Sequence, residues 1–190
     1  MIQTKDDLKR YMEQDRKAYG KEAKCSLREC LANELFPDNN WEYVKCLRRL
    51  EYAVNNQRFS RYYYTWRLQK LRAKTGIQLL PNVAGPGLHI LHGSIIVHED
   101  AKIGSNCKIA QFVTIGGESR YDRNGAPTIG ERVFIGAGAV IIGDVKVADD
   151  VVIGANAVVA RDILEPGITV AGVPARKISS ENSAHYIRCQ

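Results

Sequence analysis

The chain has 190 residues, a net charge of +6, 45% hydrophobic residues and 25% charged residues. This hydrophobic content is too high for a disordered protein, and no apolar run reaches the roughly 18 residues that a membrane span requires. The charged first residues lack the apolar centre of a signal peptide, so we expect a cytoplasmic protein. The five cysteines are odd in number and show no zinc-like pairing, which favours free thiols in a reducing compartment.

Two segments of different composition share the chain. Residues 1–76 contain 17 Lys/Arg and 10 Asp/Glu, whereas residues 77–190 contain 10 and 11. The second segment holds 14 of the 16 glycines, and the first holds seven of the nine tyrosines and both tryptophans. We therefore expect a helical segment over 1–76, a repetitive domain over 77–178 and a short polar tail over 179–190, to which we assign no function.

Capping signals and apolar spacing predict four helices in the first segment. The hydroxyl of Thr4 precedes two first-turn acids and begins the first helix, and Gly76 follows the last helix as a C-cap. Three consecutive tyrosines, 62–64, would suit a strand equally well. The predicted helical ranges are about 4–19, 25–35, 41–54 and 58–74.

The helical segment carries a strongly basic run over residues 45–74, with nine Lys/Arg, one acid and interleaved aromatic side chains. We favour a solvated helix face with aromatic residues packed beneath it, because runs of charge are weakly specific. A surface for phosphate-rich or membrane-attached partners is the second interpretation. Nucleic-acid binding is the third, but no recognised motif accompanies the charge, and we expect no nucleic-acid partner.

The second segment repeats every six residues. Aliphatic residues recur at this spacing in two runs, and the position four residues further on is small or branched. The aliphatic positions are Val97, Ile103, Ile109 and Ile115, then Ile129, Ile135, Ile141, Val147, Ile153 and Val159. Glycine often follows the aliphatic residue, as at Gly104, Gly116, Gly130, Gly136 and Gly154.

This period predicts a parallel β-helix in which each hexad forms a short strand and a corner. Each aliphatic side chain points inward and stacks on its counterpart one coil away, at about 4.8 Å. We expect the recurring glycines to adopt corner dihedral angles that side chains resist. The polar segment 117–126 interrupts the repeat and is expected to project as a loop, where binding commonly occurs.

The repeat resembles the hexapeptide-repeat acyltransferases, most closely the serine acetyltransferases and related sugar O-acetyltransferases. Four motifs between about residues 80 and 178 carry the resemblance: Gly-Leu-His-Ile-Leu-His at 87–92, Val-Thr-Ile-Gly-Gly at 113–117, Ile-Gly-Ala-Gly-Ala at 135–139 and Ala-Gly-Val-Pro-Ala-Arg at 171–176. The resemblance implies a left-handed β-helix, an acetyl-CoA-dependent O-acetyltransferase and a homotrimer.

By this resemblance His92 is the catalytic general base, which removes the proton of the attacking hydroxyl. His89 and His98 are competitors; His98 is expected to face outward, and the direction of His89 stays open. Some left-handed β-helices are zinc carbonic anhydrases, but these require histidines on separate coils, and none lies between His98 and His185. We therefore expect no metal.

The departures from the serine acetyltransferase pattern concern the residues around this base. The aspartate that precedes the family's catalytic histidine is Leu91 here, and a supporting upstream aspartate aligns near Gln78. The arginine and second histidine of the inserted loop fall at Gly125 and Ala126. Because these residues would orient the base and hold the amino acid, we favour a sugar or glycan precursor over serine as acceptor.

Acetyl-CoA is the expected donor, and the resemblance implies which regions of the chain contact it. Its pantetheine arm is expected to pass small residues at Gly117, Ala137 and Ala155. Arg176 and Lys177 are expected to face its phosphates, since both are cationic and lie near the end of the stack. Corner packing and ordinary surface charge are the structural alternatives for these five residues.

Three functions remain open at this point. We favour an acetyl-CoA-dependent O-acetyltransferase of polysaccharide assembly, acting on a small-molecule or glycan acceptor, with peripheral contact to a membrane-linked substrate through the basic helices. Serine acetylation for cysteine biosynthesis is the alternative. A trimeric scaffold without activity is the third, and His92 with the intact cofactor-side motifs counts against it.

Overall fold

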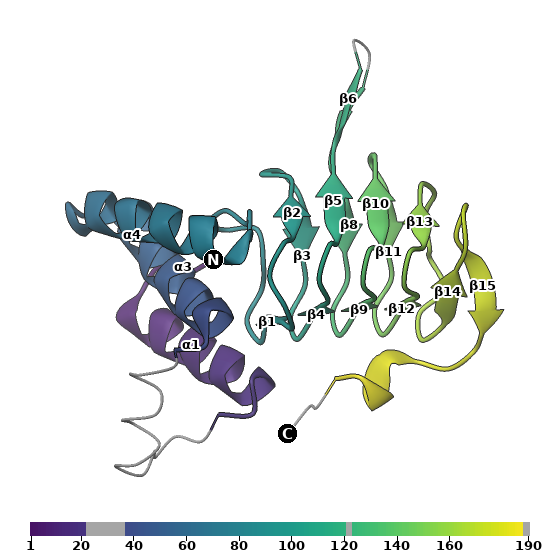
Figure 1. The fold of residues 1–190 in the computed structure, drawn as a ribbon, viewed down its shortest axis with the longest axis horizontal. Coiled ribbons are helices and arrows are strands. Elements are labelled where there is room, and N and C mark those ends of the chain that lie inside the picture. The colour runs from purple at the N-terminus through teal and green to yellow at the C-terminus, as the bar shows by residue number, and fades with distance from the viewer. Residues whose placement is uncertain (22–36, 121–122, 188–190) are drawn as a thin grey trace.

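The computed structural model describes residues 1–21, 37–120 and 123–187. The helix expected over 25–35 therefore lies outside the described residues. Figure 1 shows the described helices gathered at one end of a stack of short strands, with one hairpin projecting from the side of the stack. The two compositions seen in the sequence thus correspond to a helical part and a strand part.

Three predicted helices are present: α1 (Lys5–Ala18), α3 (Asn39–Asn55) and α4 (Ser60–Thr75). Thr4 and Asp7 form a reciprocal capping box at the start of α1, with each side chain accepting from the other residue's backbone N–H at 3.0 Å. Gly76 ends α4 in the left-handed region, with φ of 70°. The strand alternative for residues 62–64 is wrong, because all three tyrosines lie inside α4.

The strands form three parallel sheets, as the hexad repeat predicts. The first sheet contains β1 (His89–Ile90), β4 (Lys108–Ile109), β9 (Phe134–Ile135), β12 (Val152–Ile153) and β14 (Thr169–Ala171), with β15 (Arg176–Ser179) added antiparallel. The second contains β2 (Ile96–Val97), β5 (Thr114–Gly116), β10 (Val140–Ile142) and β13 (Val158–Val159). The third contains β3 (Lys102–Ile103), β8 (Thr128–Ile129) and β11 (Lys146–Val147).

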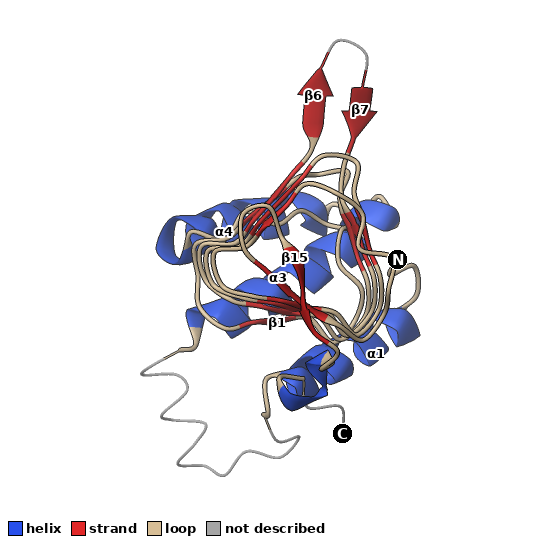
Figure 2. Cartoon of the chain, turned by 90° about the vertical axis from the view of Figure 1, so that its right-hand side faces the viewer, coloured by secondary structure: helices blue, strands red, loops and turns tan. Residues whose placement is uncertain are grey.

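The predicted inward positions form the core of this triangular stack (Figure 2). Ile109 stands in register with Ile135, and Ile135 with Ile153, so one aliphatic column runs through the first sheet. All ten aliphatic hexad positions are at most 6% exposed. Burying these columns on three sides is what stabilises the stack, because no hexad could cover its own apolar side chain.

The reason for the recurring glycines differs from the expected one. The left-handed corner positions are occupied mainly by other residues, for example Phe112 at φ 59° and Asn156 at φ 55°. Gly104, Gly130 and Gly136 are instead sites of close approach between coils. A Cβ on Gly104 would lie 2.4 Å from the Gly130 carbonyl oxygen, and one on Gly136 would lie 2.6 Å from the Ala155 nitrogen. The corner-dihedral explanation was therefore wrong for these two positions, where coil spacing excludes a side chain.

The interruption of the repeat forms a two-stranded antiparallel hairpin, β6 (Glu118–Arg120) and β7 (Arg123–Gly125). It leaves the stack after β5 and returns before β8, so it projects from a corner between the second and third sheets (Figure 2). This position confirms that the insertion stands outside the regular coils.

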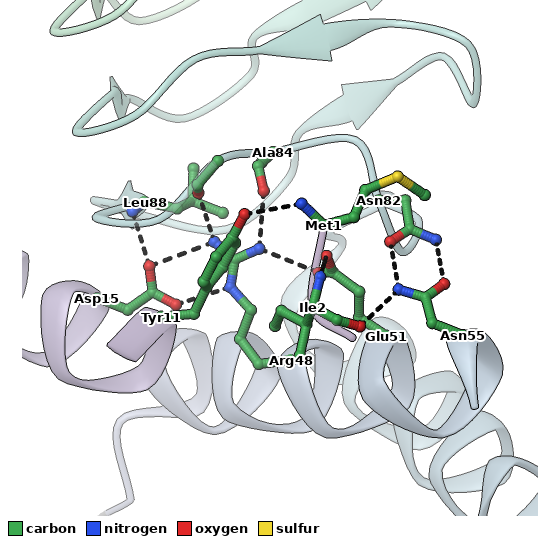
Figure 3. A network of polar contacts seen from close by, with 11 residues as sticks. Met1, Ile2, Tyr11, Asp15, Arg48, Glu51, Asn55, Asn82, Ala84 and Leu88 are labelled. Atoms are coloured by element: carbon green, nitrogen blue, oxygen red, sulfur yellow. Dashed lines mark hydrogen bonds and ion pairs between the residues drawn. The ribbon is translucent and has the colours of Figure 1, made fainter. Parts of the chain in front are cut away.

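A buried polar network joins the helices to the first coil (Figure 3). Arg48 of α3 donates to both carboxylate oxygens of Asp15 in α1, at 2.8 and 3.3 Å, and to Glu51 at 3.2 Å. It also donates to the carbonyl oxygens of Ala84 and Gly85. A single guanidinium thus contacts α1, α3 and the first coil at once.

The end of the chain turns back along the first sheet. After β15, the short 3₁₀ helix η1 (Ser183–His185) leads to Tyr186, whose ring stacks on Phe134 at 4.2 Å. The Lys108 ammonium donates to the Tyr186 carbonyl oxygen at 3.0 Å. The described part of the tail is thus packed against β4 and β9.

The exposed aromatic side chains of the basic run contradict the favoured interpretation for four of its six rings, whereas Tyr52 and Tyr64 are partly buried. Phe59 is 91% exposed, Tyr62 62%, Tyr63 52% and Trp66 59%. These four rings do not pack beneath a solvated basic face, because they form part of the surface themselves.

Candidate active site

His92, the predicted general base, lies at the corner between β1 and β2 in the first coil. Its side chain is exposed and borders a cavity of about 500 Å³ between this corner, the start of α3 and the end of α4. The cavity is lined by Asp38, Asn39, Asn40, Lys74, Thr75, His92, Gly93, Ser94, Gln111 and Phe112. The helical part and the β-helix therefore build this site together.

Backbone contacts on both sides of His92 hold its corner in place. The Leu91 N–H donates to the Ile109 carbonyl at 2.9 Å, and the Leu91 carbonyl accepts from the Asn40 side chain at 3.4 Å. Past the histidine, the Ser94 N–H donates to the Thr75 carbonyl at 2.7 Å. Gly93 passes so close to α4 that a Cβ there would lie 1.9 Å from the Thr75 oxygen. The end of α4 thus fixes where His92 projects.

The His92 imidazole makes no hydrogen bond or ion pair with any residue that the structure describes. The positions that align with supporting residues of the serine enzymes do not supply a partner. Leu91 is apolar, and the Gln78 side chain accepts a hydrogen bond from Arg72 at 2.9 Å. Gly125 and Ala126 lie at the base of the hairpin, at a different corner of the same chain. Both ring nitrogens are therefore free to meet a substrate.

His89 is held in a structural environment distinct from that of His92. Its ring packs on Tyr19, the C-cap residue of α1, at 4.4 Å between centroids. Burial, with the positive charge of Lys108 beside it, lowers the pKa of His89 to about 4. The imidazole is consequently neutral at physiological pH and acts as a packing residue between α1 and the first sheet.

His98 lies at the other end of β2, near the hairpin. Its Nδ1 accepts from the Asp100 backbone N–H at 3.2 Å, and its side chain is 39% exposed, in keeping with the predicted outward direction. A Cβ on Gly117 would approach His98 Nε2 to 2.9 Å. His98 therefore closes the space beside Gly117, and the two lie away from the His92 corner.

The predicted cofactor positions fall in three places. Ala137 and Ala155 occupy the same corner column as His92, one and two coils beyond the Gln111–Phe112 corner, and the Ala137 carbonyl accepts from Asn156 at 2.8 Å. Gly117 lies at the base of the hairpin. Arg176 and Lys177 lie on β15 at the far end of the stack.

The two cations on β15 differ in their surroundings. Lys177 donates to Glu165 at 2.7 Å, whereas the exposed Arg176 has no ion pair within the described part of the chain. Arg176 is thus the one more readily available to a phosphate group. Ala137 and Ala155 share a corner with the predicted base, and Gly117 does not.

The sequence interpretation missed two charged residues of the His92 cavity, Lys74 and Asp38. Asp38 caps α3, with its Oδ1 accepting from the backbone N–H of Asn40 and Trp41 at 3.1 Å each. Its Oδ2 lies 3.4 Å from the Lys21 ammonium. The capping pattern marks Asp38 as a helix start, but no local signal relates it to a histidine on the other segment.

No group of three or more His, Cys, Asp or Glu side chains among the described residues is arranged to hold a metal ion. None of the described helices is long and apolar enough to cross a bilayer.

Comparison with known proteins identifies relatives over most of the chain. Residues 126–161 match the family described as bacterial transferase hexapeptide (six repeats). Serine acetyltransferase from Helicobacter pylori strain J99 is 36% identical over 167 residues, which cover 82% of this chain and 96% of that protein. Serine acetyltransferase from Synechocystis is 38% identical over 150 residues, 73% of this chain and 59% of that protein.

Solved structures extend the similarity to the whole described fold. Serine acetyltransferase from Neisseria gonorrhoeae superposes with a TM-score of 0.73 at 27% identity, covering 96% of this chain and 71% of that one. The Brucella abortus enzyme in complex with coenzyme A gives a TM-score of 0.72 at 25% identity, covering 94% and 70%. These neighbours confirm the predicted left-handed β-helix preceded by helices.

Proposed function

Because this chain belongs to the serine acetyltransferase-like hexapeptide acyltransferases, we propose that it transfers an acetyl group to the hydroxyl of serine with His92 as general base. The chain is an acyltransferase, and its donor is acetyl-CoA. The identity of the acceptor and the roles of individual residues are the content of the proposal.

One observation carries the choice of acceptor: the cavity of His92 also holds a cation and a carboxylate. Lys74 and Asp38 both line it, and serine presents a carboxylate and an ammonium group to bind. Electrostatic complementarity of this kind orients a small zwitterion with its hydroxyl toward the histidine. Relatives named serine acetyltransferase over 82% of the chain support the same acceptor. The preference for a sugar acceptor rested on the departures at Leu91, Gln78, Gly125 and Ala126, and the relatives named serine acetyltransferase support serine instead.

His92 would act as follows. Its free imidazole nitrogen takes the proton of the serine hydroxyl while the oxygen attacks, and the imidazolium later returns this proton to the leaving sulfur. The Gly93 N–H, the next backbone donor, has no acceptor among the described residues and is free to donate to the developing oxyanion. Bound acetyl-CoA supplies the thioester carbonyl that is attacked.

The cofactor groups are placed by the same proposal. Ala137 and Ala155 leave the His92 corner open along the stack, so the pantetheine arm would lie against their backbone, with Arg176 toward the phosphates. Gly117 and Lys177 remain weaker candidates, because His98 and Glu165 already occupy the space beside them. A cytoplasmic location, where acetyl-CoA is available, belongs to the proposal.

We also propose a homotrimer. Large apolar side chains are exposed along the corner column that begins at His92 and on the adjoining second sheet: Phe112 at 67%, Val173 at 73% at the far end of the column, Ile96 at 49% and Ile142 at 42%. Burying them against a neighbouring copy would remove this apolar surface from water and could bring groups of that copy to His92. Sedimentation of the full chain tests the assembly, and a monomer at all concentrations would contradict it.

The experiment for the reaction follows thiol release from acetyl-CoA, with serine and separately with nucleotide sugars and oligosaccharides as acceptors. We expect serine-dependent release that falls at least 10²-fold in His92→Ala. The control His98→Ala removes a histidine of the other corner and is expected to retain most activity. Thiol release that depends on a sugar but not on serine would contradict serine as the acceptor. Full activity in His92→Ala would contradict His92 as the general base.

A further inference from the structure

The N-terminal half of α4 exposes a stripe of four aromatic rings. Phe59, Tyr62, Tyr63 and Trp66 follow the i, i+3, i+4, i+7 spacing of one helix face, and each is more than half exposed. The opposite face carries Leu68 and Leu71, which are buried against the rest of the protein. The stripe is therefore a second, unpaired apolar face of a helix whose packing needs are already met.

A cavity of about 540 Å³ lies next to this stripe, between α1, α3 and the start of α4. Its lining combines apolar and basic side chains: Lys5, Leu8, Lys9, Met12, Arg49, Tyr52, Arg58, Ser60 and Tyr64. Tyr63 of the stripe contacts Tyr64 of the cavity edge to face, with 5.2 Å between the rings. The stripe and the cavity thus adjoin along the first turns of α4, and we call the two together the aromatic–basic face.

The cations of this face lack a carboxylate partner in the part of the chain that the structure describes. Among the described residues, no carboxylate forms an ion pair with Lys5, Lys9, Arg49 or Arg58, and no acid lines the cavity. α4 itself contains five Lys/Arg and no Asp or Glu. Arg58 and Arg61 lie over the rings of Tyr52 and Tyr62, at 4.9 and 4.8 Å, which keeps guanidinium groups at the level of the aromatic surface.

We propose that the aromatic–basic face docks on an anionic lipid bilayer. Tyrosine and tryptophan rings favour the boundary between headgroups and acyl chains, and each Lys or Arg near an anionic surface strengthens binding. A cavity with apolar walls and a basic rim also suits a lipid headgroup above its glycerol backbone. A second copy of this chain fits less well, because pairing the two stripes would bring two acid-free helices together.

This docking is independent of the acceptor proposed above. Figure 1 shows α4 ending beside the strands, where Lys74 and Thr75 line the His92 cavity, while the stripe occupies the first half of the helix. A bilayer on the stripe therefore leaves the opposite end of α4 to the active site. Docking would bring the enzyme to the membrane without using any residue assigned to catalysis.

Vesicle flotation with the full chain tests the proposal. We expect binding to vesicles of phosphatidylcholine with 30% phosphatidylglycerol, little binding to pure phosphatidylcholine, and loss of binding at high salt. Phe59→Ser combined with Trp66→Gln should lower the partition coefficient at least tenfold. Serine is a good N-cap and glutamine a good helix former at these two exposed positions, so α4 is expected to stay folded.

Matched control variants distinguish binding through the aromatic–basic face from non-specific binding to vesicles. Leu164→Ser removes an apolar side chain that is 69% exposed on the β-helix and should leave binding unchanged. Lys9→Gln should weaken binding about fivefold, since one cation contributes about 1 kcal/mol near an anionic surface, whereas Lys102→Gln on β3 should not.

Fluorescence of Trp66 gives a second readout. Its emission should shift to shorter wavelength on vesicle addition, and this shift should be absent in Trp66→Phe, which retains Trp41. The proposal is overturned by unchanged binding in the double variant or by no vesicle binding. If vesicle binding is absent and the chain instead self-associates through the stripe, or binds inorganic phosphate in the cavity, the face has another ligand and the membrane proposal is wrong.

Discussion

Arg48 and Asp15 meet inside the protein through two hydrogen bonds, with their side chains only 1% and 0% exposed. Asp15 also accepts from the backbone N–H of Leu88 at 2.9 Å, so the carboxylate connects α1 to the first coil directly. The negative charge of Asp15 raises the pKa of Arg48, against the opposing effect of its burial. Arg48 is therefore a buried cation that depends on its carboxylate partners.

Arg48→Met should lower the free energy of unfolding by about 3–5 kcal/mol, because it leaves the carboxylates of Asp15 and Glu51 buried without their cation. Urea denaturation followed by circular dichroism measures this loss. Arg10→Ala breaks the exposed pair with Asp7 and should cost less than about 1 kcal/mol. Equal losses in the two variants would contradict the importance of burial.

The titration of His89 predicts a specific dependence of stability on pH. Its pKa is lowered from an ordinary value of about 6.5 to about 4, so the unfolded chain binds the extra proton first as pH falls. Stability is full above pH 6.5 and declines between pH 6.5 and 4. Discounted for the partial exposure of the ring, we expect about 1–2 kcal/mol from this group.

Urea midpoints at pH 7.5 and pH 4.5 measure the effect. His89→Gln should show a smaller loss between these values than the unmodified protein, whereas His98→Gln should lose as much as the unmodified protein. An identical pH dependence in His89→Gln would show that its burial does not contribute.

Gly93→Ala should reduce acetyl transfer at least tenfold. A Cβ there would lie 1.9 Å from the Thr75 carbonyl oxygen, so the corner that carries His92 must move away from α4. A displacement of about 1 Å near reacting groups is sufficient for losses up to about 10²-fold. Steady-state rates of thiol release measure the change.

Gly116→Ala is the matched control for this change. Its Cβ would meet only Ile142 Cγ2, at an ordinary 3.6 Å, so activity should remain within about twofold. Similar losses in both variants would indicate that any added methyl group disturbs the stack, and would refute a specific role for the contact between Gly93 and Thr75.

The buried thiol of Cys107 should resist alkylation until the protein unfolds. Burial raises its pKa to about 12, and its Sγ lies 3.2 Å from the Gly130 carbonyl oxygen. Mass spectrometry after iodoacetamide treatment in increasing urea should show labelling of Cys107 that follows the unfolding transition. Labelling in the absence of urea as fast as that of free glutathione would contradict this burial.

The β-helix could be predicted because its repeat is local: one hexad specifies one strand, and registers such as Ile109 with Ile135 follow from stacking equal units. The helix ends were predictable for the same reason, since caps such as Thr4 and Gly76 act within a few residues. The reason for the recurring glycines could not be predicted from the sequence. A Cβ on Gly104 would collide with Gly130, which lies on the next coil, so this contact involves two coils.

The candidate site was predicted in part. His92 could be named from the motif around it, since its position in the first coils is part of the pattern. Lys74 and Asp38 could not, because they reach the His92 cavity only through the packing of α4 and α3 against the first coil. The ion pair between Arg48 and Asp15 could not be predicted for the same reason, because it joins residues 33 positions apart on two helices.

The parallel stacking of coils has a consequence for the size of the donor. From β1 to β15 the first sheet advances five strands, which at about 4.8 Å each amounts to roughly 24 Å between the corner of His92 and the strand that carries Arg176. The distance between two corners along the axis of the β-helix is therefore a whole number of coil spacings. Under the proposed placement of acetyl-CoA, the length of the donor therefore sets how many coils separate His92 from Arg176, and gaining or losing one coil would change that distance by about 4.8 Å.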